Sequence, residues 1–480
     1  MELLQNFING EYTQPIDKQY IDNFEPATGN VYSQIPNSNE KDVEIAVKAA
    51  QEAFPIWSNY SIEKRSKILM KVADGIRKRM DQFIAAESKD NGKPVSLAAH
   101  VDIPRAISNF EFYATGIQHF ASNSHYMVGV GVNYTLRKPI GVVGCISPWN
   151  LPLYLFSWKI APALAAGNCV IAKPSEVTPY TAYLLGEVIK ESGMPNGVLN
   201  ILHGLGATVG DAIVKHPAIK AISFTGGTKT GEYIARTAAP MFKKMSLELG
   251  GKNPNIIFAD CDFDEMLKIT VRSSFANQGQ ICLCGSRIFV ERPIYEKFKT
   301  AFVEKVSRMK VSYPSDEQAN MGALVSKPHL EKVLSYIELA QQEGGTVLTG
   351  GERVQMEAPY ENGYFLRPTV IEGLSYDCRT NQEEIFGPVV TITPFDTEEE
   401  VLMMANSVKY GLSATVWTTN LQRAHRVADE IEAGIVWIND WLVRDLRTPF
   451  GGAKASGVGR EGGWDALEFF TEPKNVFIKY

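Results

Sequence analysis

Cys282 stands in a setting suited to nucleophilic catalysis. The polar stretch FANQGQI leads to it, and a small residue, Gly285, follows closely. A cysteine among small and polar residues can be reached by a substrate, and its thiolate is a strong nucleophile. Free cysteines are also among the most buried residues of proteins, so this pattern alone leaves a buried, inert thiol as the alternative.

Two further residues could assist such a nucleophile. Glu248 ends an apolar run, and a carboxylate in apolar surroundings has a raised pKa, as a general base for water requires. Asn150 lies in PWNLPL, where the flanking prolines limit backbone freedom, so its amide could donate to a developing oxyanion. Taken alone, these residues could equally be a solvent-facing edge-strand glutamate and an ordinary turn asparagine.

Groups suited to a nucleotide cofactor occur where predicted strands lead into helices. Lys173 and Glu176 follow a strand in IAKPSEVTP, where ligand groups of open α/β sheets usually lie. The segment SFTGGTKTG places Gly227 and Gly231 at another such junction, which allows a pyrophosphate to approach backbone N–H groups. The string GLGATVG, which ends at Gly210, has one residue too many for G-x-G-x-x-G and is weak evidence by itself.

The elements that must position these residues alternate between strands and helices. Residues 40–120 carry long helical periodicities, such as DVEIAVKAAQEAF and SKILMKVADGIRKRMDQFIAAES. From residue 134, short apolar runs such as VGCIS, NCVIAKP, AISFTGG and NIIFAD alternate with helical segments. After residue 285 we expect a helix from Lys327 to Gly344 and strands near 346, 369, 390 and 414. This order predicts an α/β protein with mainly parallel sheets in two units.

The composition narrows the classes of function. The chain has 480 residues, 48 Lys+Arg against 54 Asp+Glu, and 45% hydrophobic residues, as expected for a globular protein of two or three domains. It has no basic block for a nucleic acid, no apolar stretch near the ~20 residues of a membrane span, and no basic start of a signal peptide. We therefore expect a cytoplasmic protein without nucleic-acid or membrane partners.

The cysteine pattern does not predict a metal centre. The six cysteines form no dense framework and are expected to be thiols. Cys282 and Cys284 have no second Cys or His pair at ligand spacing, and the seven histidines are scattered singly. We expect no bound metal.

Seven motifs lie in a characteristic order along nearly the whole chain: PWN (148–150), KPSE (173–176), FTGG (224–227), ELGGKNPNI (248–256), GQIC (279–282), EEIFGPV (383–389) and PFGGAKASGVGRE (449–461). In content and order they resemble the motifs of the NAD(P)-dependent aldehyde dehydrogenases. The resemblance implies an aldehyde dehydrogenase-like α/β fold, with two Rossmann-like parallel-sheet domains and a β-arm for oligomerisation.

The resemblance also implies a covalent oxidation at Cys282. Its thiolate adds to the aldehyde carbon, and the Asn150 side chain and the Cys282 backbone N–H hold the oxyanion. Hydride passes to the nicotinamide and leaves a thioester, which water activated by Glu248 then hydrolyses. Cys284 is interpreted as a neighbouring thiol without this role. A non-catalytic relative is disfavoured, because all three catalytic residues are present.

The cofactor assignment follows from the same resemblance. It implies that Lys173 and Glu176 hold the adenosine ribose, and that Glu384 and Phe386 place the nicotinamide ribose. A carboxylate at 176 suits the ribose 2′-OH and would repel a 2′-phosphate, so NAD is the predicted cofactor. The other cofactor-binding residues are expected to be Trp149, Gly210, Gly227 and Gly231.

Two arginines narrow the substrate. Arg105 in DIPRA and Arg444 in WLVRDL match positions that face the family's substrate tunnel, and two converging guanidiniums favour a carboxylate. Their pairing resembles the branch that oxidises 2-aminomuconate and 2-hydroxymuconate 6-semialdehydes, intermediates of aromatic and tryptophan breakdown. Alternatively, the arginines are surface or ion-paired residues, with Arg444 bound to Asp445, and the substrate is a neutral or cationic aldehyde such as a betaine, amino or aliphatic aldehyde. Arg447 is expected nearer the surface.

The implied architecture has three parts. An NAD-binding domain covers residues 1–116 and 140–249, a catalytic domain covers 250–455, and an arm covers 117–139 and 466–480. The β-patterned segments SNSHYMVGVGVNYTLRKP and EPKNVFIKY could pair with each other or with another subunit. Since family members are dimers or tetramers, we expect a homo-oligomer.

Overall fold

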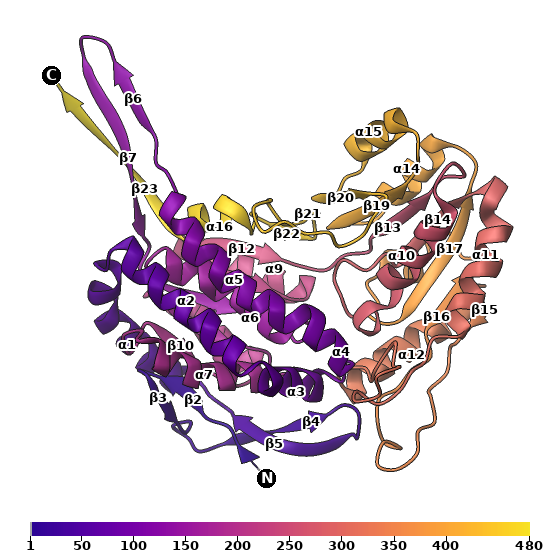
Figure 1. The fold of residues 1–480 in the computed structure, drawn as a ribbon, viewed down its shortest axis with the longest axis horizontal. Helices are drawn as coiled ribbons and strands as arrows, with labels where there is room; N and C mark the ends of the chain where they lie inside the picture. The colour runs from indigo at the N-terminus through magenta and orange to yellow at the C-terminus, as the bar shows by residue number, and fades with distance from the viewer. Residues whose placement is uncertain (1) are drawn as a thin grey trace.

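The protein consists of two α/β lobes and a narrow β-arm that projects from the first lobe (Figure 1). This architecture is seen in a computed structural model that describes residues 2–480. No helix in that range has the length and apolar character needed to cross a membrane.

The first lobe is built on an eight-stranded sheet. Its strands lie in the order β22 (Gly457–Val458), β12 (Lys244–Glu248), β11 (Ile219–Thr225), β8 (Val142–Ile146), β9 (Cys169–Lys173), β10 (Leu199–Ile201), β2 (Asn6–Ile8) and β3 (Glu11–Thr13). The strands from β12 to β10 are parallel. The chain runs from β8 to β9 and β10 on one side, and then to β11 and β12 on the other. Ligands of such sheets bind at the carboxyl ends of the strands where the order reverses, which here is between β8 and β11.

Helices cover both faces of this sheet. They are α1 (Glu40–Ser58), α2 (Ile62–Lys78), α3 (Met80–Asn91), α5 (Ile103–Gly116), α6 (Pro152–Ala165), α7 (Tyr180–Ser192), α8 (Asp211–Lys215) and α9 (Thr228–Ala238). Helix α6 packs against β8 and β9 on one side and α5 on the other, so all of its residues are buried. A smaller sheet of β1 (Glu2–Leu3), β5 (Asn30–Pro36) and β4 (Tyr20–Glu25) lies beside the N-terminus.

The second lobe repeats the parallel α/β pattern. Its seven strands lie in the order β15 (Thr346–Thr349), β16 (Thr369–Glu372), β17 (Val389–Phe395), β14 (Arg287–Glu291), β13 (Pro254–Ile257), β19 (Ser413–Trp417) and β20 (Ile435–Ile438), and only β15 is antiparallel. Its helices are α10 (Phe263–Phe275), α11 (Arg292–Ser307), α12 (Lys327–Gln342), α14 (Glu398–Asn406) and α15 (Leu421–Glu430). The strands expected near 346, 369, 390 and 414 are thereby confirmed, as is the helix that begins at Lys327.

The arm is a three-stranded antiparallel sheet of β6 (Ser124–Met127), β7 (Gly131–Pro139) and β23 (Thr471–Lys479). Strand β23 pairs with β7 along its whole length, so the two β-patterned segments do pair with each other. Helix α16 (Gly463–Phe469) precedes β23, so the start of the segment 466–480 is helical.

One expected helix is two helices. The apolar period over residues 66–88 continues without interruption, but the structure breaks it at Arg79 between α2 and α3. Arg79 has φ −114° and ψ 24°, outside the helical region. Because both helices bury the same apolar stripe, the period carries no sign of the break.

Candidate active site

Cys282 lies in the loop between α10 and β14, at a cavity of about 250 Å³ that Asn150, Gly250 and Glu384 also line. The loop is held from two sides. The Asn253 side-chain amide donates to the carbonyls of Cys282 (2.7 Å) and Cys284 (2.9 Å), and the Trp441 indole donates to the carbonyl of Leu283 (2.8 Å). These bonds fix the backbone of the nucleophile and of the two residues that follow it.

The surroundings of Cys282 favour the thiol form. Burial raises its pKa, the negative charges of Glu384 and Glu248 raise it further, and Arg444 lowers it. The proton must therefore leave Cys282 before or as the sulfur attacks. Cys284 is buried, and burial raises its pKa to about 12. Only Cys282 of the two thiols lines the cavity.

Asn150 is buried just before the first turn of α6. Its side-chain N–H₂ group donates to the carbonyl of Gln280 at 2.9 Å, two residues before the nucleophile. That bond uses one of the two amide protons, which leaves the other for a ligand in the cavity. The structure thus brings together Asn150 and Cys282, although they are far apart in the sequence.

Glu248 ends β12 and is buried, not exposed on an edge strand. Neither carboxyl oxygen has a hydrogen-bond partner among residues 2–480. Burial raises its pKa well above the usual value, the nearby Glu461 raises it further, and Lys159, Arg460 and Arg444 oppose this. A buried carboxylate with both oxygens free is a suitable base for an incoming water.

Behind Glu248 lies a buried polar group that the sequence analysis did not single out. Lys159 Nζ contacts Glu461 Oε1 at 2.6 Å, and the Ser223 hydroxyl donates to the same oxygen at 3.0 Å. Two signals could have pointed to it. Lys159 is the one charged residue of α6, and Glu461 closes the motif PFGGAKASGVGRE.

Glu384 and Phe386 lie on the far wall of the Cys282 cavity. Glu384 Oε1 accepts a hydrogen bond from the backbone N–H of Gly251 at 2.8 Å, and Phe386 has a left-handed φ of 64°. The rings of Trp149 and Phe386 meet edge to face, with centroids 5.3 Å apart. His329, which was not predicted, also packs on Trp149, and its ring bonds the Phe386 carbonyl at 2.7 Å.

A second cavity, of about 640 Å³, lies at the carboxyl ends of β8 and β11, where the strand order reverses. Ile146 and Phe224 give it apolar walls, and Glu176 lies at its edge. Lys173 Nζ is buried and bonds Glu176 Oε2 at 2.8 Å. Burial alone would raise the pKa of Glu176, but the positive charge and hydrogen bond of Lys173 help to lower it below its usual value. Gly210 also lines the cavity, and an added Cβ there would meet the Lys173 side chain at 3.6 Å.

The N-terminus of α9 borders both cavities: Gly227 lines the Cys282 cavity, and Lys229 and Thr230 line the second cavity. Gly227 caps this helix without a side-chain hydrogen bond, and an added Cβ there would meet nothing within 4 Å. Backbone N–H groups of its first turn are thus available to an anion. Gly231 is placed differently. It lies inside α9, where an added Cβ would meet Leu249 at 2.4 Å, and it is not among the residues that line either cavity.

A third cavity, of about 850 Å³, contains both predicted substrate arginines. Arg105 lies 5.7 Å from the Tyr154 ring, and Arg444 donates to the Tyr154 hydroxyl at 3.1 Å. Asp445 pairs with Arg447 at 2.5 Å and not with Arg444, and Arg447 is the more exposed arginine, as expected. Arg272, which was not predicted, lines the same cavity and donates to the Trp441 carbonyl at 3.1 Å.

Comparison with known proteins decides the family. Residues 12–476 match the model described as the aldehyde dehydrogenase family. The chain belongs to this family.

Relatives and solved structures of aldehyde dehydrogenases match the chain over its whole length. It is 53% identical to the 2-aminomuconic semialdehyde dehydrogenase of Danio rerio, over 100% of this chain and 98% of that protein. It is 48% identical to the 2-hydroxymuconic semialdehyde dehydrogenase of Pseudomonas sp. (strain CF600), over 100% of both chains. The NAD+ complex structure of aldehyde dehydrogenase from Bacillus cereus has a TM-score of 0.96 and 41% identity, covering 100% of this chain and 97% of that one.

In this aldehyde dehydrogenase, the residues expected to do chemistry lie in three neighbouring regions. Asn150 and Cys282 share the innermost cavity with Glu384 and Phe386, while Glu248 lies close enough to raise the pKa of Cys282. Across residues 2–480, no group of three or more His, Cys, Asp and Glu side chains is arranged to hold a metal ion. Asp440 faces its own backbone, since its carboxylate accepts from the Trp441 N–H at 2.6 Å.

Proposed function

We propose that this enzyme oxidises a carboxylate-bearing semialdehyde, 2-aminomuconate or 2-hydroxymuconate 6-semialdehyde, to the dicarboxylic acid with NAD as the acceptor. One observation carries the proposal. Arg105 and Arg444 line one cavity, and neither guanidinium pairs with a carboxylate among residues 2–480. Two guanidiniums without an acidic partner form a site for carboxylate oxygens.

Support for this substrate also comes from the relatives. Proteins named 2-aminomuconic semialdehyde dehydrogenase and 2-hydroxymuconic semialdehyde dehydrogenase match the whole chain at 53% and 48% identity. A protein named 4-trimethylaminobutyraldehyde dehydrogenase, whose substrate is a cation, matches at 42%. A cationic substrate would be repelled by the two arginines.

The residues of the cofactor region fit NAD. The apolar walls beside Ile146 and Phe224 suit a planar base, the Glu176 carboxylate suits ribose hydroxyls, and the uncapped N-terminus of α9 suits a pyrophosphate. We propose that Lys173, Glu176, Gly210, Trp149, Gly227, Glu384 and Phe386 hold NAD, with Gly231 giving α9 its close packing. When bound, NAD would provide the nicotinamide ring that accepts the hydride.

Oxidation begins at Cys282. As its proton leaves, the sulfur bonds to the aldehyde carbon and the carbonyl electron pair moves onto oxygen, where the Asn150 amide donates to the new oxyanion. When the oxyanion re-forms its carbonyl, the carbon loses hydride and becomes a thioester. Arg105 and Arg444 hold the distant carboxylate and so fix the direction of the aldehyde.

Hydrolysis then needs a base, and Glu248 is in place for it. Its carboxylate takes a proton from water, the oxygen bonds to the thioester carbon, and the carbon–sulfur bond breaks to release the acid and restore Cys282. Because the pKa of Glu248 is raised, its carboxylate takes up the water proton more readily than an exposed glutamate would.

We infer that the lobes divide the work as the sequence suggests. Residues 1–116 and 140–249 form the NAD-binding domain, residues 250–455 form the catalytic domain, and the arm of β6, β7 and β23 joins subunits into a homo-oligomer. Exposed apolar residues on the arm support this last point, since Tyr126 is 65% exposed and Val128 is 84% exposed.

The substrate is tested by kinetics of NADH formation. We expect kcat/KM for 2-hydroxymuconate semialdehyde to exceed that for an uncharged aldehyde of similar length by about tenfold or more, about 1.4 kcal/mol of transition-state preference. Arg105→Ala and Arg444→Ala should remove this preference. Arg447→Ala is the matched control, because its guanidinium is already bound by Asp445. An unchanged preference in both arginine variants would return these residues to structural roles and move the search to amino and aliphatic aldehydes.

A further inference from the structure

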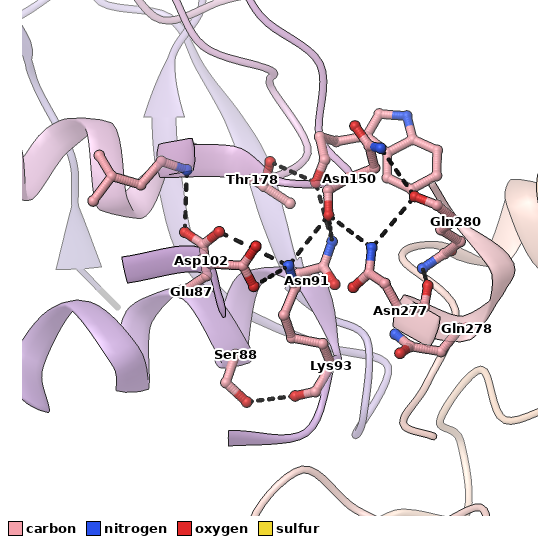
Figure 2. Close-up of polar contacts among 12 residues, drawn as sticks. Glu87, Ser88, Asn91, Lys93, Asp102, Asn150, Thr178, Asn277, Gln278 and Gln280 are labelled. Atoms are coloured by element: carbon pink, nitrogen blue, oxygen red, sulfur yellow. Dashed lines mark hydrogen bonds and ion pairs between the residues drawn. The ribbon is translucent and has the colours of Figure 1, made fainter. Parts of the chain in front are cut away.

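Beneath Asn150 lies a set of buried charges that the chemistry above does not use. Lys93, Glu87 and Asp102 have fully buried side chains. Lys93 Nζ contacts Asp102 Oδ2 at 2.8 Å and Glu87 Oε1 at 3.9 Å (Figure 2). Burial raises the pKa of Glu87 to about 8 and also raises that of Asp102. Removing charges from water is costly, and an apolar side chain of similar size is often tolerated equally well in such a place.

The same ammonium reaches the backbone of Asn150. Lys93 Nζ donates to the Asn150 main-chain carbonyl at 3.2 Å, and the side-chain amides of Asn91 and Asn277 donate to that oxygen at 3.3 and 2.9 Å. Figure 2 shows the three donors converging on it. A single carbonyl with three side-chain donors, two from the stretch 91–93 and one from Asn277, is held more firmly than one in a regular turn.

This carbonyl also connects to the loop of the nucleophile. The Asn277 amide donates to the carbonyl of Gln280 at 3.3 Å as well, and the Asn150 side chain donates to that same carbonyl at 2.9 Å. Asn277 and Gln278 have left-handed φ values of 52° and 58°, which side-chain-bearing residues adopt only when their surroundings require it. The Asn150 backbone and the Cys282 loop are therefore held by one network.

We propose that Lys93 is a positioning residue for the oxidation: its ammonium, held by Asp102 and Glu87, fixes the Asn150 backbone and thereby the place from which the Asn150 amide meets the oxyanion. This inference rests on the proposed function, in which Asn150 is the oxyanion donor. A methionine at 93 would fill the same space but would leave the Asn150 carbonyl without its charged donor.

The test is a double-mutant cycle measured with the full-length enzyme, saturating NAD and the preferred aldehyde. Lys93→Met should lower kcat by about tenfold or more, but by no more than the roughly 10²–10³-fold that complete loss of an oxyanion donor costs. KM for the aldehyde should change by less than about twofold. If Lys93 acts through Asn150, adding Lys93→Met to Asn150→Ala should lower kcat little further. Fully multiplicative losses would overturn the proposal, because they would show that Lys93 acts independently of Asn150.

A second pair of variants separates positioning from folding. Lys93→Met with Asp102→Asn removes the ammonium and the carboxylate nearer to it, so Asp102 is not left as an unpaired buried anion. Glu87 remains, but its pKa is already raised to about 8 and loses the lowering effect of Lys93, so it stays protonated at neutral pH. The double variant should regain thermal stability but keep the low kcat; recovery of kcat would contradict the positioning role. Arg65→Met is the matched control, since Arg65 is a buried cation that holds the carbonyls of Tyr60 and Ala165, the latter at the far end of α6. It should lose stability and keep kcat.

Different outcomes would contradict the oxyanion role of Asn150 and the positioning role of Lys93. If Asn150→Ala keeps its kcat, Asn150 is not the oxyanion donor, and the proposed mechanism and this inference fall together. If Asn150→Ala is slow but Lys93→Met is as fast as the parent, only the role of Lys93 is wrong.

Discussion

At the residue scale, the surroundings of the nucleophile and the base set their protonation in the same direction. Burial raises the pKa of both Cys282 and Glu248, and Arg444 lowers both. The two groups are needed in their charged forms, so the resting site opposes its own chemistry until a substrate and a proton acceptor arrive. Charges near these groups should therefore shift the pH dependence of turnover.

The hydrolytic step should follow the ionisation of Glu248. Its folded pKa is raised, so the active carboxylate is lost as pH falls through that raised value. Glu461 is the charge that raises it most. In the Glu461→Gln variant, the acidic limb of the kcat–pH profile should therefore move to lower pH. Burial should still keep the pKa of Glu248 above that of an exposed glutamate. The measurement is a pH profile of steady-state turnover. As a comparison, Glu248→Gln should form NADH in a single burst and then show no further turnover. A limb that does not move in Glu461→Gln would show that another group titrates.

Of the two neighbouring thiols, only one should matter for turnover. Cys282 lines the inner cavity, whereas Cys284 is buried behind it and its backbone N–H bonds the Ile281 carbonyl at 3.0 Å. Cys284→Ala should leave kcat within about twofold of the parent, and Cys282→Ala should abolish it. The rate of NADH formation gives kcat for each variant, and thiol labelling shows which cysteine is accessible. A loss in Cys284→Ala as deep as that in Cys282→Ala would refute the assignment of the nucleophile.

At the element scale, each reactive group stands where a regular element ends. Glu248 ends β12, Asn150 precedes α6, and Cys282 lies between α10 and β14. Backbone hydrogen bonds of β12 hold Glu248 in place. The carbonyl of Asn150 is instead held by the side chains beneath it. Cys282 lies outside any strand or helix, and side chains add to the few backbone bonds of its loop. Asn253 and Trp441 do so from outside the loop, and Asn277 does so from within it. This explains why these supporting residues cannot be found from local patterns.

The β-arm should hold the oligomer together. Val128 in its turn and Ile478 on β23 are 84% and 49% exposed, which is unusual for apolar residues without a partner surface. Val128→Asp combined with Ile478→Asp should lower the mass measured by light scattering to that of one 53.1 kDa chain. Leu421→Asp, at a residue 71% exposed on the second lobe, should leave the mass unchanged. A parent protein that is already monomeric would refute the role of the arm.

At the scale of the whole molecule, the sequence predicted the fold class and several residues of the inner cavity. It did not predict His329 in the cavity lining or the network around the site. Motifs and strand–helix alternation are local, so Cys282, Glu248 and Asn150 could be anticipated. The two β-patterned arm segments could be recognised, but whether they pair with each other or with another subunit stayed open. Lys159 and Glu461 are 302 residues apart, and the Lys93 network draws on four segments. Such contacts depend on how the elements pack, which no local period records. The same holds for the break at Arg79 and for Arg272.

The edge strand β22 has a consequence for how the protein is made. It pairs with β12 at Leu247 and Glu248, although residue 457 is synthesised some two hundred residues later. Until then, a ribosome-bound chain has Glu248 on an open edge, with Gly451 and Glu461 still missing from its side. Burial by this part of the chain and the charge of Glu461, which raise the pKa of Glu248, therefore cannot both be in place before residue 461 is made. The raised pKa of Glu248, and the hydrolytic step that depends on it, therefore require the C-terminal part of the chain.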